Sequence, residues 1–314
     1  MLTLWWYGLG DLPGDEVAMN PSLLPSTLER PTPRIIRNFL VRNFGDLGDA
    51  APPVREWLVE GLIPMGTVTF LSGDGGLGKT LLGQQLIMAA ALGEAWCGRP
   101  TRQVRSVALF CEDDADEIHR RAASIARHHF TKVTDPRLKA TAFLCELGED
   151  NALMRAAAPH EGAPAFRTTM MYDTIKDWAH RRQARLVLLD SLHDIFAGNE
   201  NYRPEARAFV QALTALARDI NGAVVVAAHP SLTGLDRGSG TSGSTAWNNA
   251  VRSRLYLTRP EGEDDDVRVL KTVKANYGRI GETILLRRKG GVFVVREARD
   301  KRRRGFDANA VARS

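Results

Sequence analysis

Residues 67–80 organise this sequence and read Thr67-Val68-Thr69-Phe70-Leu71-Ser72-Gly73-Asp74-Gly75-Gly76-Leu77-Gly78-Lys79-Thr80. An apolar, β-branched run precedes a glycine-rich loop, and the segment after the loop, from Leu81 to Leu92, contains one helix breaker, Gly83. This order predicts a strand, a phosphate-binding loop of the pattern G-x-x-x-x-G-K-T, and an amphipathic helix. Glycines allow successive backbone N–H groups to point at phosphate oxygens, and the helix start adds the positive end of its dipole.

The loop pattern also predicts which residues hold ATP. We expect Lys79 to reach the β- and γ-phosphates, as a catalytic as well as a binding residue, and the Thr80 hydroxyl to ligate Mg²⁺. The expected nucleotide-binding residues are Gly73, Asp74, Gly75, Gly76, Leu77, Gly78, Lys79, Thr80 and Leu81. ATP and Mg²⁺ are therefore the expected cofactors.

Length and composition limit the class of protein. The 314 residues are 44% hydrophobic, enough for one large core. We expect an irregular N-terminal arm over 1–52, because it holds five prolines between Pro13 and Pro33, one α/β domain over 53–298, and a basic tail over 299–314. The net charge of +5 permits contact with a polyanion but does not require it.

The cysteines and the apolar runs exclude other classes. Cys97, Cys111 and Cys145 lack the close spacing of metal sites and fit reduced, buried thiols. No apolar run is long enough for a membrane helix, and the opening Met1–Tyr7 lacks the basic residues of a signal peptide. We therefore expect a soluble, cytoplasmic protein without membrane contact.

The order of predicted elements indicates an α/β fold, a mostly parallel twisted sheet flanked by helices, with C-terminal antiparallel strands. A short helix over Arg34–Arg42 precedes this domain. Further strands are expected at 105–111, 141–145, 185–190 and 223–228, with helices at 115–129, 169–182 and 204–220. Antiparallel strands are expected at 254–258, 267–273, 283–288 and 292–296, with a hairpin turn at Gly290-Gly291.

Several polar residues follow predicted parallel strands, whose carboxyl ends form the usual ligand-binding edge. Asp190 ends an apolar run and is a candidate Mg²⁺ ligand. Because Ser191, not glutamate, follows it, we expect Glu112 to be the base that activates water, on a strand that can lie beside the phosphate-loop strand. The alternative role for Glu112 or Asp113 is to cap the next helix; we assign that cap to Asp113 or Asp114.

Residues later in the chain complete the predicted site. His229, at the end of an apolar run, is a candidate sensor of the γ-phosphate, and the alternative is a structural histidine before a proline. A cation from a neighbouring subunit would stabilise the transition state. The candidates are Arg252, Arg254 and Lys274, each of which has an ordinary surface charge as its alternative role.

From about Trp57 to Arg288 the chain resembles the RepA-like hexameric replicative helicases of plasmids and phages, within the RecA/DnaB class of P-loop ATPases. The segments that carry the resemblance are 73–80, Glu112-Asp113, 188–191, 228–231, 243–252 and Lys274-Ala275-Asn276-Tyr277-Gly278. The resemblance implies a RecA-like core with Glu112 as the catalytic glutamate, Asp190 as the Mg²⁺-binding aspartate and His229 as the sensor histidine. It also implies that Arg252 is an arginine finger acting on a neighbouring subunit and that Lys274 is a second such cation. Ala228 stands where the family has another histidine.

Two functional hypotheses follow. The first is an ATP-driven motor, a homo-oligomeric ring, expected to be a hexamer, that threads single-stranded DNA past loops at 198–203 and 231–245 and contacts replication proteins. Tyr202, Arg203 and Arg237 are the expected DNA contacts. The second is a nucleotide-gated DNA-binding or regulatory ATPase without unwinding activity. A small-molecule kinase is disfavoured because nothing resembles a lid or an acceptor site.

Overall fold

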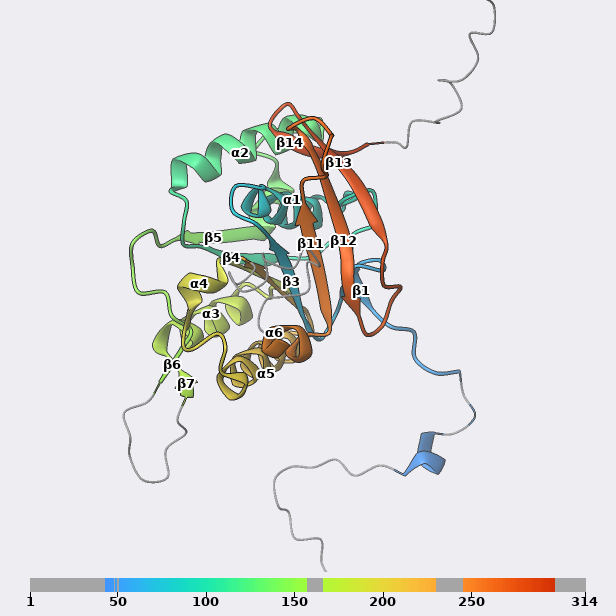
Figure 1. The fold of residues 1–314 in the computed structure, drawn as a ribbon, viewed down its shortest axis with the longest axis vertical. Helices are drawn as coiled ribbons and strands as arrows, with labels where there is room; N and C mark the ends of the chain where they lie inside the picture. The colour runs from blue at the N-terminus through green and yellow to red at the C-terminus, as the bar shows by residue number, and fades with distance from the viewer. Residues whose placement is uncertain (1–42, 48, 50, 157–165, 230–244, 297–314) are drawn as a thin grey trace, which may run out of the picture. The chain divides into compact units, whose positions relative to one another are not determined.

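The computed structural model describes residues 43–47, 49, 51–156, 166–229 and 245–296 (Figure 1). The chain divides into two units, Met1–Pro53 and Val54–Ser314. In the first unit one element is described, a 3₁₀ turn at Phe44–Leu47. The helix predicted over Arg34–Arg42 and the tail over 299–314 lie outside the described residues.

The second unit is built on a nine-stranded sheet with the order β14-β13-β12-β11-β3-β10-β8-β4-β5. The central strand is β3 (Val68–Gly73), and both of its neighbours, β10 (Ala223–Ala228) and β11 (Ser253–Thr258), run parallel to it. The other strands are β4 (Ser106–Phe110), β5 (Thr141–Cys145), β8 (Leu186–Asp190), β12 (Val267–Ala275), β13 (Thr283–Lys289) and β14 (Val292–Val295). The α/β class with a mostly parallel sheet flanked by helices is therefore confirmed.

Strand order and direction correct two expectations. β4, which precedes Glu112, does not pair with β3, because β10 and β8 lie between them. β11 was expected to be antiparallel, yet it pairs parallel with β3 and antiparallel only with β12. Strand β11 thus ends at the same edge of the sheet as the phosphate loop, with Leu257 beside Gly73.

Helices cover both faces of the sheet (Figure 1). Buried side chains of α1 (Lys79–Leu92) and α2 (Ala115–His128) belong to one apolar cluster, and those of α3 (Met170–Arg181) and α5 (Arg203–Asp219) belong to the other. Two short helices, α4 (Leu192–Ile195) and α6 (Thr245–Ala250), contribute to the second cluster as well. The strands buried on both faces, such as β8, are the continuous apolar runs of the sequence.

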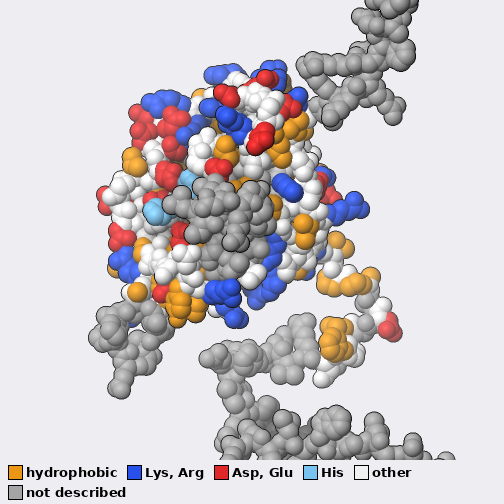
Figure 2. Space-filling view, viewed as in Figure 1, with side chains coloured by type: hydrophobic (Ala, Val, Ile, Leu, Met, Phe, Trp, Pro, Cys, Tyr) orange, Lys and Arg blue, Asp and Glu red, His pale blue; other side chains and the backbone are white. Residues whose placement is uncertain are grey.

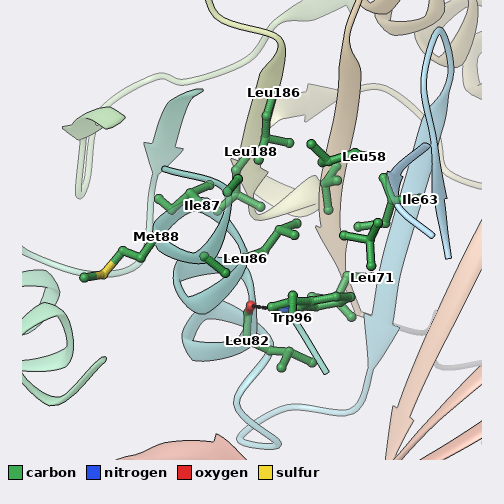
Figure 3. Close-up of a cluster of buried hydrophobic side chains, with 14 of the residues drawn as sticks. Leu58, Ile63, Leu71, Leu82, Leu86, Ile87, Met88, Trp96, Leu186 and Leu188 are labelled. Atoms are coloured by element: carbon green, nitrogen blue, oxygen red, sulfur yellow. Dashed lines mark hydrogen bonds between the residues drawn. The ribbon is translucent and has the colours of Figure 1, made fainter. Parts of the chain in front are cut away.

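The first helix is not amphipathic, which corrects the prediction for 81–92. Every residue of α1 except Thr80 is buried, because strands of the sheet, including β14, contact the helix together with η3 (Pro136–Ala140) and α2. Figure 3 shows its leucines among side chains of several strands, and Trp96 donates a hydrogen bond to the Leu82 carbonyl at 3.0 Å. Gly83 allows α1 to pack closely on β8, since a Cβ there would lie 3.2 Å from the methyl groups of Leu188.

Smaller elements complete the unit. β1 (Trp57–Val59) pairs with β2 (Ile63–Pro64), and β6 (Met154–Ala156) lies between β7 (Phe166–Thr168) and β9 (Phe196–Ala197). The sequence patterns did not predict these short strands. The predicted hairpin is present, with Gly290 and Gly291 at φ values of 61° and 85°, as a tight two-residue turn requires. Within the described residues, no helix has the length and apolar character needed to cross a membrane.

Candidate active site

The phosphate loop connects the end of β3 to the start of α1. Gly76 and Gly78 have φ values of 71° and 95°, a region that glycine enters without steric cost. A Cβ on Gly73 would lie 2.5 Å from the Leu257 carbonyl oxygen, and one on Gly78 would lie 2.8 Å from the Phe293 ring. The C-terminal strands therefore pack directly against the loop, and the glycines make room for them.

Lys79 is buried at the centre of the site, with 5% of its surface exposed. Its ammonium donates to the carbonyl oxygens of Gly73 at 2.8 Å and Asp74 at 2.9 Å. Burial lowers the pKa of Lys79, and the negative charges of Asp190 and Glu112 oppose that shift. The charge is thus held inside the curve of the loop, where phosphate oxygens would be better partners than neutral carbonyls.

Asp190 is the second buried charge of the site. It ends β8, is 2% exposed, and its Oδ2 has no hydrogen-bond partner in the described part of the chain. Burial raises the pKa of Asp190 to about 7; a hydrogen bond from Thr80 opposes this shift and the charge of Glu112 adds to it. The peptide bond from Asp190 to Ser191 is cis.

These two side chains fit a magnesium ion. An orphaned buried carboxylate oxygen next to a threonine hydroxyl is a donor set that a hard cation prefers. The described residues contain no group of three or more His, Cys, Asp or Glu that could hold a metal alone. This suits Mg²⁺, which proteins usually bind through one or two side chains together with phosphate oxygens.

Glu112 and His229 lie at the open side of the site, and their side chains are 47% and 41% exposed. The backbone N–H of Cys111 donates to the Asp190 carbonyl at 2.7 Å, which places Glu112 at the end of β8. His229 Nε2 lies 3.7 Å from a Glu112 oxygen, and its Nδ1 lies 3.3 Å from the Lys79 nitrogen. The structure therefore brings together a carboxylate, an imidazole and the loop lysine.

The three acidic residues directly after β4 make different contacts and therefore have different roles. Asp114 caps α2 by accepting a hydrogen bond from the backbone of Glu117 at 2.7 Å. Asp113 forms a two-bond ion pair with Arg121, at 2.6 and 3.0 Å. Glu112 makes neither contact, so its carboxylate remains available at the site.

Arg252 and Lys274 lie at the opposite edge of the sheet from Lys79. Arg252 directly precedes β11, whose first residue pairs with Thr69 near the start of β3, and Lys274 pairs with Arg254 on the adjacent strand. Burial lowers the pKa of Lys274, and the nearby charge of Arg252 adds to the shift. Within one chain these two cations do not join the group around Lys79.

The predicted DNA contacts are placed only in part. Tyr202 precedes α5 with 53% of its surface exposed, and Arg203 is the first residue of that helix. Arg203 lines a cavity together with Arg252. Arg237 lies outside the described residues.

Two residues of β11 contact the end of β3 and the phosphate loop. Arg254 is 5% exposed, and its Nε donates to the Ser72 hydroxyl at 3.2 Å, so its expected role as a surface or intersubunit charge is wrong. The Tyr256 hydroxyl donates to Asp74 at 3.5 Å. Tyr256 could not be recognised from sequence patterns, because its place beside Ser72 depends on the parallel pairing of β11 with β3, which was not predicted.

Comparison with known proteins gives one family. A family model described as an AAA domain matches residues 36–234, more than half of the chain. The matched segment contains the phosphate loop, Glu112, Asp190 and His229, and it ends before Arg252 and Lys274. No curated protein matches the chain.

We predict that Asp190→Asn stabilises the nucleotide-free protein in EDTA. The raised pKa means that the folded state binds a proton more tightly than the unfolded state, so wild-type stability falls as pH rises from about 4 to about 7. Asparagine removes this loss, by up to about 4 kcal/mol above pH 7 and by little near pH 4. Urea unfolding at pH 4.5, 6 and 8 measures the difference. Asp116→Asn, at an exposed position, should change stability by less than about 0.5 kcal/mol. Equal or lower stability of Asp190→Asn at pH 8 would contradict the prediction.

Proposed function

From the membership of this chain in the AAA domain family of P-loop ATPases, we propose that it is a Mg²⁺-dependent ATPase that acts as a ring-forming, RepA-like DNA helicase in plasmid or phage replication. The observation that carries the ATPase part is the meeting of Lys79, Glu112, Asp190 and His229 at the carboxyl edge of one sheet. These residues come from β3 and α1, β4, β8 and β10, so only the folded sheet brings them together.

The arrangement suits hydrolysis of a triphosphate. In the proposed reaction the phosphate loop and Lys79 hold the phosphates, and Glu112 accepts a proton from the water that attacks the γ-phosphorus. His229, between Glu112 and Lys79, donates a hydrogen bond to the γ-phosphoryl oxygens. Mg²⁺, held by Thr80 and Asp190, would supply neutralisation of phosphate charge.

The ring is proposed from two cations that lie apart from the Lys79 site of their own chain. Arg252 and Lys274 lie together at the edge opposite Lys79, so a nucleotide that they contact must belong to another copy of the chain. The resemblance to hexameric helicases supplies the ring size and single-stranded DNA as the substrate. Replication proteins are further proposed partners.

A regulatory ATPase is the second candidate, because the described DNA-loop residues offer few contacts. Tyr202 is exposed beside Arg203, yet these two described loop residues supply only one aromatic ring and one cation, a weak surface for nucleic acid. Such a protein would bind and release partners as nucleotide is hydrolysed, without moving along DNA.

One assay separates the two functions. We expect single-stranded DNA to raise ATP turnover several-fold, and ATP hydrolysis to displace a strand from a tailed duplex. Turnover that rises with DNA but displaces no strand would support the regulatory ATPase. Turnover that is indifferent to DNA, with no strand displacement, would remove DNA from the proposal.

We predict that Glu112→Gln lowers kcat for ATP hydrolysis by about a hundredfold or more, because the amide cannot accept the proton of the attacking water. Nucleotide affinity should change less than about threefold, since Lys79 and the loop remain. Steady-state phosphate release and a binding titration measure the two quantities. The matched control is Glu146→Gln, at the end of the neighbouring strand β5, which should hydrolyse ATP like the wild type. Near wild-type turnover by Glu112→Gln would exclude it as the base.

A further inference from the structure

A basic groove runs along α5 at the edge of the sheet opposite the phosphate loop. It is a cavity of about 1070 Å³ between α5, α6 and Gly66-Thr67, just before β3. Five cationic side chains and one acidic side chain line it, namely Lys176, Arg203, Arg207, Arg218, Arg252 and Asp219. Figure 2 shows Lys and Arg side chains gathered at the lower edge of this face, where Figure 1 places α5 and α6.

The charges of Arg207 and Arg218 in the basic groove are not balanced within the described chain. Asp219 is already paired, with Lys176 at 3.1 Å and with His180 at 2.8 Å. Arg207 and Arg218 form no ion pair with any described carboxylate. Both are exposed on the outer face of α5, whose inner face packs into the core, so both side chains are accessible to a second molecule.

The opposite edge of the same chain is acidic. Residues 112–117 hold five carboxylates in six positions, and we call this segment the acidic collar. Asp113 and Glu117 are partly neutralised by Arg121, and Asp114 caps α2. Asp116 is exposed without an ion-pair partner among the described residues, and a bound triphosphate would add further negative charge beside Glu112.

We propose that the basic groove of one copy receives the acidic collar of a second copy, in a head-to-tail contact that carries Arg252 to the neighbour's nucleotide. The inference rests on the proposed function for the role of Arg252, but its charge argument is independent. Opposite charges on the two edges of one chain make a heterologous contact, which repeats from copy to copy and can close into a ring. Complementary charge sets the register of such contacts and speeds association.

Nucleic acid is the competing occupant of a basic groove, and position argues against it. Arg252 and Asn249 line the groove beside α5, so a nucleic acid there would occupy the place that the neighbour's nucleotide needs. DNA bound at Tyr202 and at the Arg203 end of the groove would leave the part beside Arg207, Arg218 and Arg252 free for protein contact.

The test uses two charge-reversed forms of the full chain. Variant A carries Arg207→Glu with Arg218→Glu, and variant B carries Asp116→Arg. Each alone replaces an attraction between Asp116 and the groove arginines by a repulsion, so both should need at least about tenfold higher protein concentration to assemble, measured by sedimentation with a non-hydrolysable ATP analogue and Mg²⁺. In an equimolar mixture the two variants can alternate, so that the substituted groove meets the substituted position 116 and the two unchanged surfaces meet each other, and assembly should improve at least about threefold over either variant alone.

A control pair keeps the inference separable from general charge effects. Arg127→Glu with Lys132→Glu makes the same change in net charge as variant A, on an exposed surface outside groove and collar, and should assemble like the wild type. Wild-type assembly by variant A, or a mixture no better than A and B alone, would overturn the docking inference. Variant A that assembles normally but loses single-stranded DNA binding would instead assign the groove to nucleic acid.

A separate measurement keeps the proposed function distinct. Mixing Arg252→Ala with Lys79→Ala chains should restore part of the ATP turnover, because some interfaces then join an intact loop to an intact arginine. Restored turnover together with wild-type assembly of variant A would exclude the docking surface and support the ring-forming ATPase. If the wild-type protein assembles, variant A does not, and the wild type hydrolyses no ATP, the docking surface would be supported and the proposed ATPase function excluded.

Discussion

Two buried charges of opposite sign, on Lys79 and Asp190, define this structure. Burying a charge is unfavourable unless partners replace the lost water. Lys79 finds the carbonyl oxygens of Gly73 and Asp74, whereas one oxygen of Asp190 has no hydrogen-bond partner in the described residues. The folded chain therefore maintains a site whose electrostatics are incomplete. In the proposed function a metal-bound triphosphate would supply the missing charges of both signs and so offset this cost.

The strand order of the sheet places both charges at the same carboxyl edge. β3 and α1 position Lys79, β8 positions Asp190, and β4 and β10 carry Glu112 and His229 to the same edge. β11 runs parallel to β3 and connects the two edges of the sheet, because it begins after Arg252 and ends beside Gly73. Through Tyr256 this strand also contacts the phosphate loop at Asp74. In the proposed ring, one strand would therefore link a neighbour's nucleotide to the chain's own.

Local sequence patterns predicted those features of the fold that depend on residues close together in the chain. The loop from Gly73 to Thr80 and the apolar run before Asp190 are local patterns, and both lie where they were expected. Strand order, the direction of β11 and the burial of α1 on all sides depend on pairings between distant segments, which periodicity does not encode. For the same reason Tyr256 was missed, and Arg254, expected at an exposed position, proved to be buried.

The central claim is that Lys79 and its loop bind a magnesium-bound triphosphate. A titration of a fluorescent ATP analogue, with Mg²⁺ or with EDTA, tests it most directly in wild type, Lys79→Ala and the exposed control Lys132→Ala. We predict saturable binding by the wild type and by Lys132→Ala that weakens at least about tenfold in EDTA, and affinity at least about tenfold lower for Lys79→Ala in Mg²⁺. No binding by the wild type, or equal binding by Lys79→Ala, would contradict it.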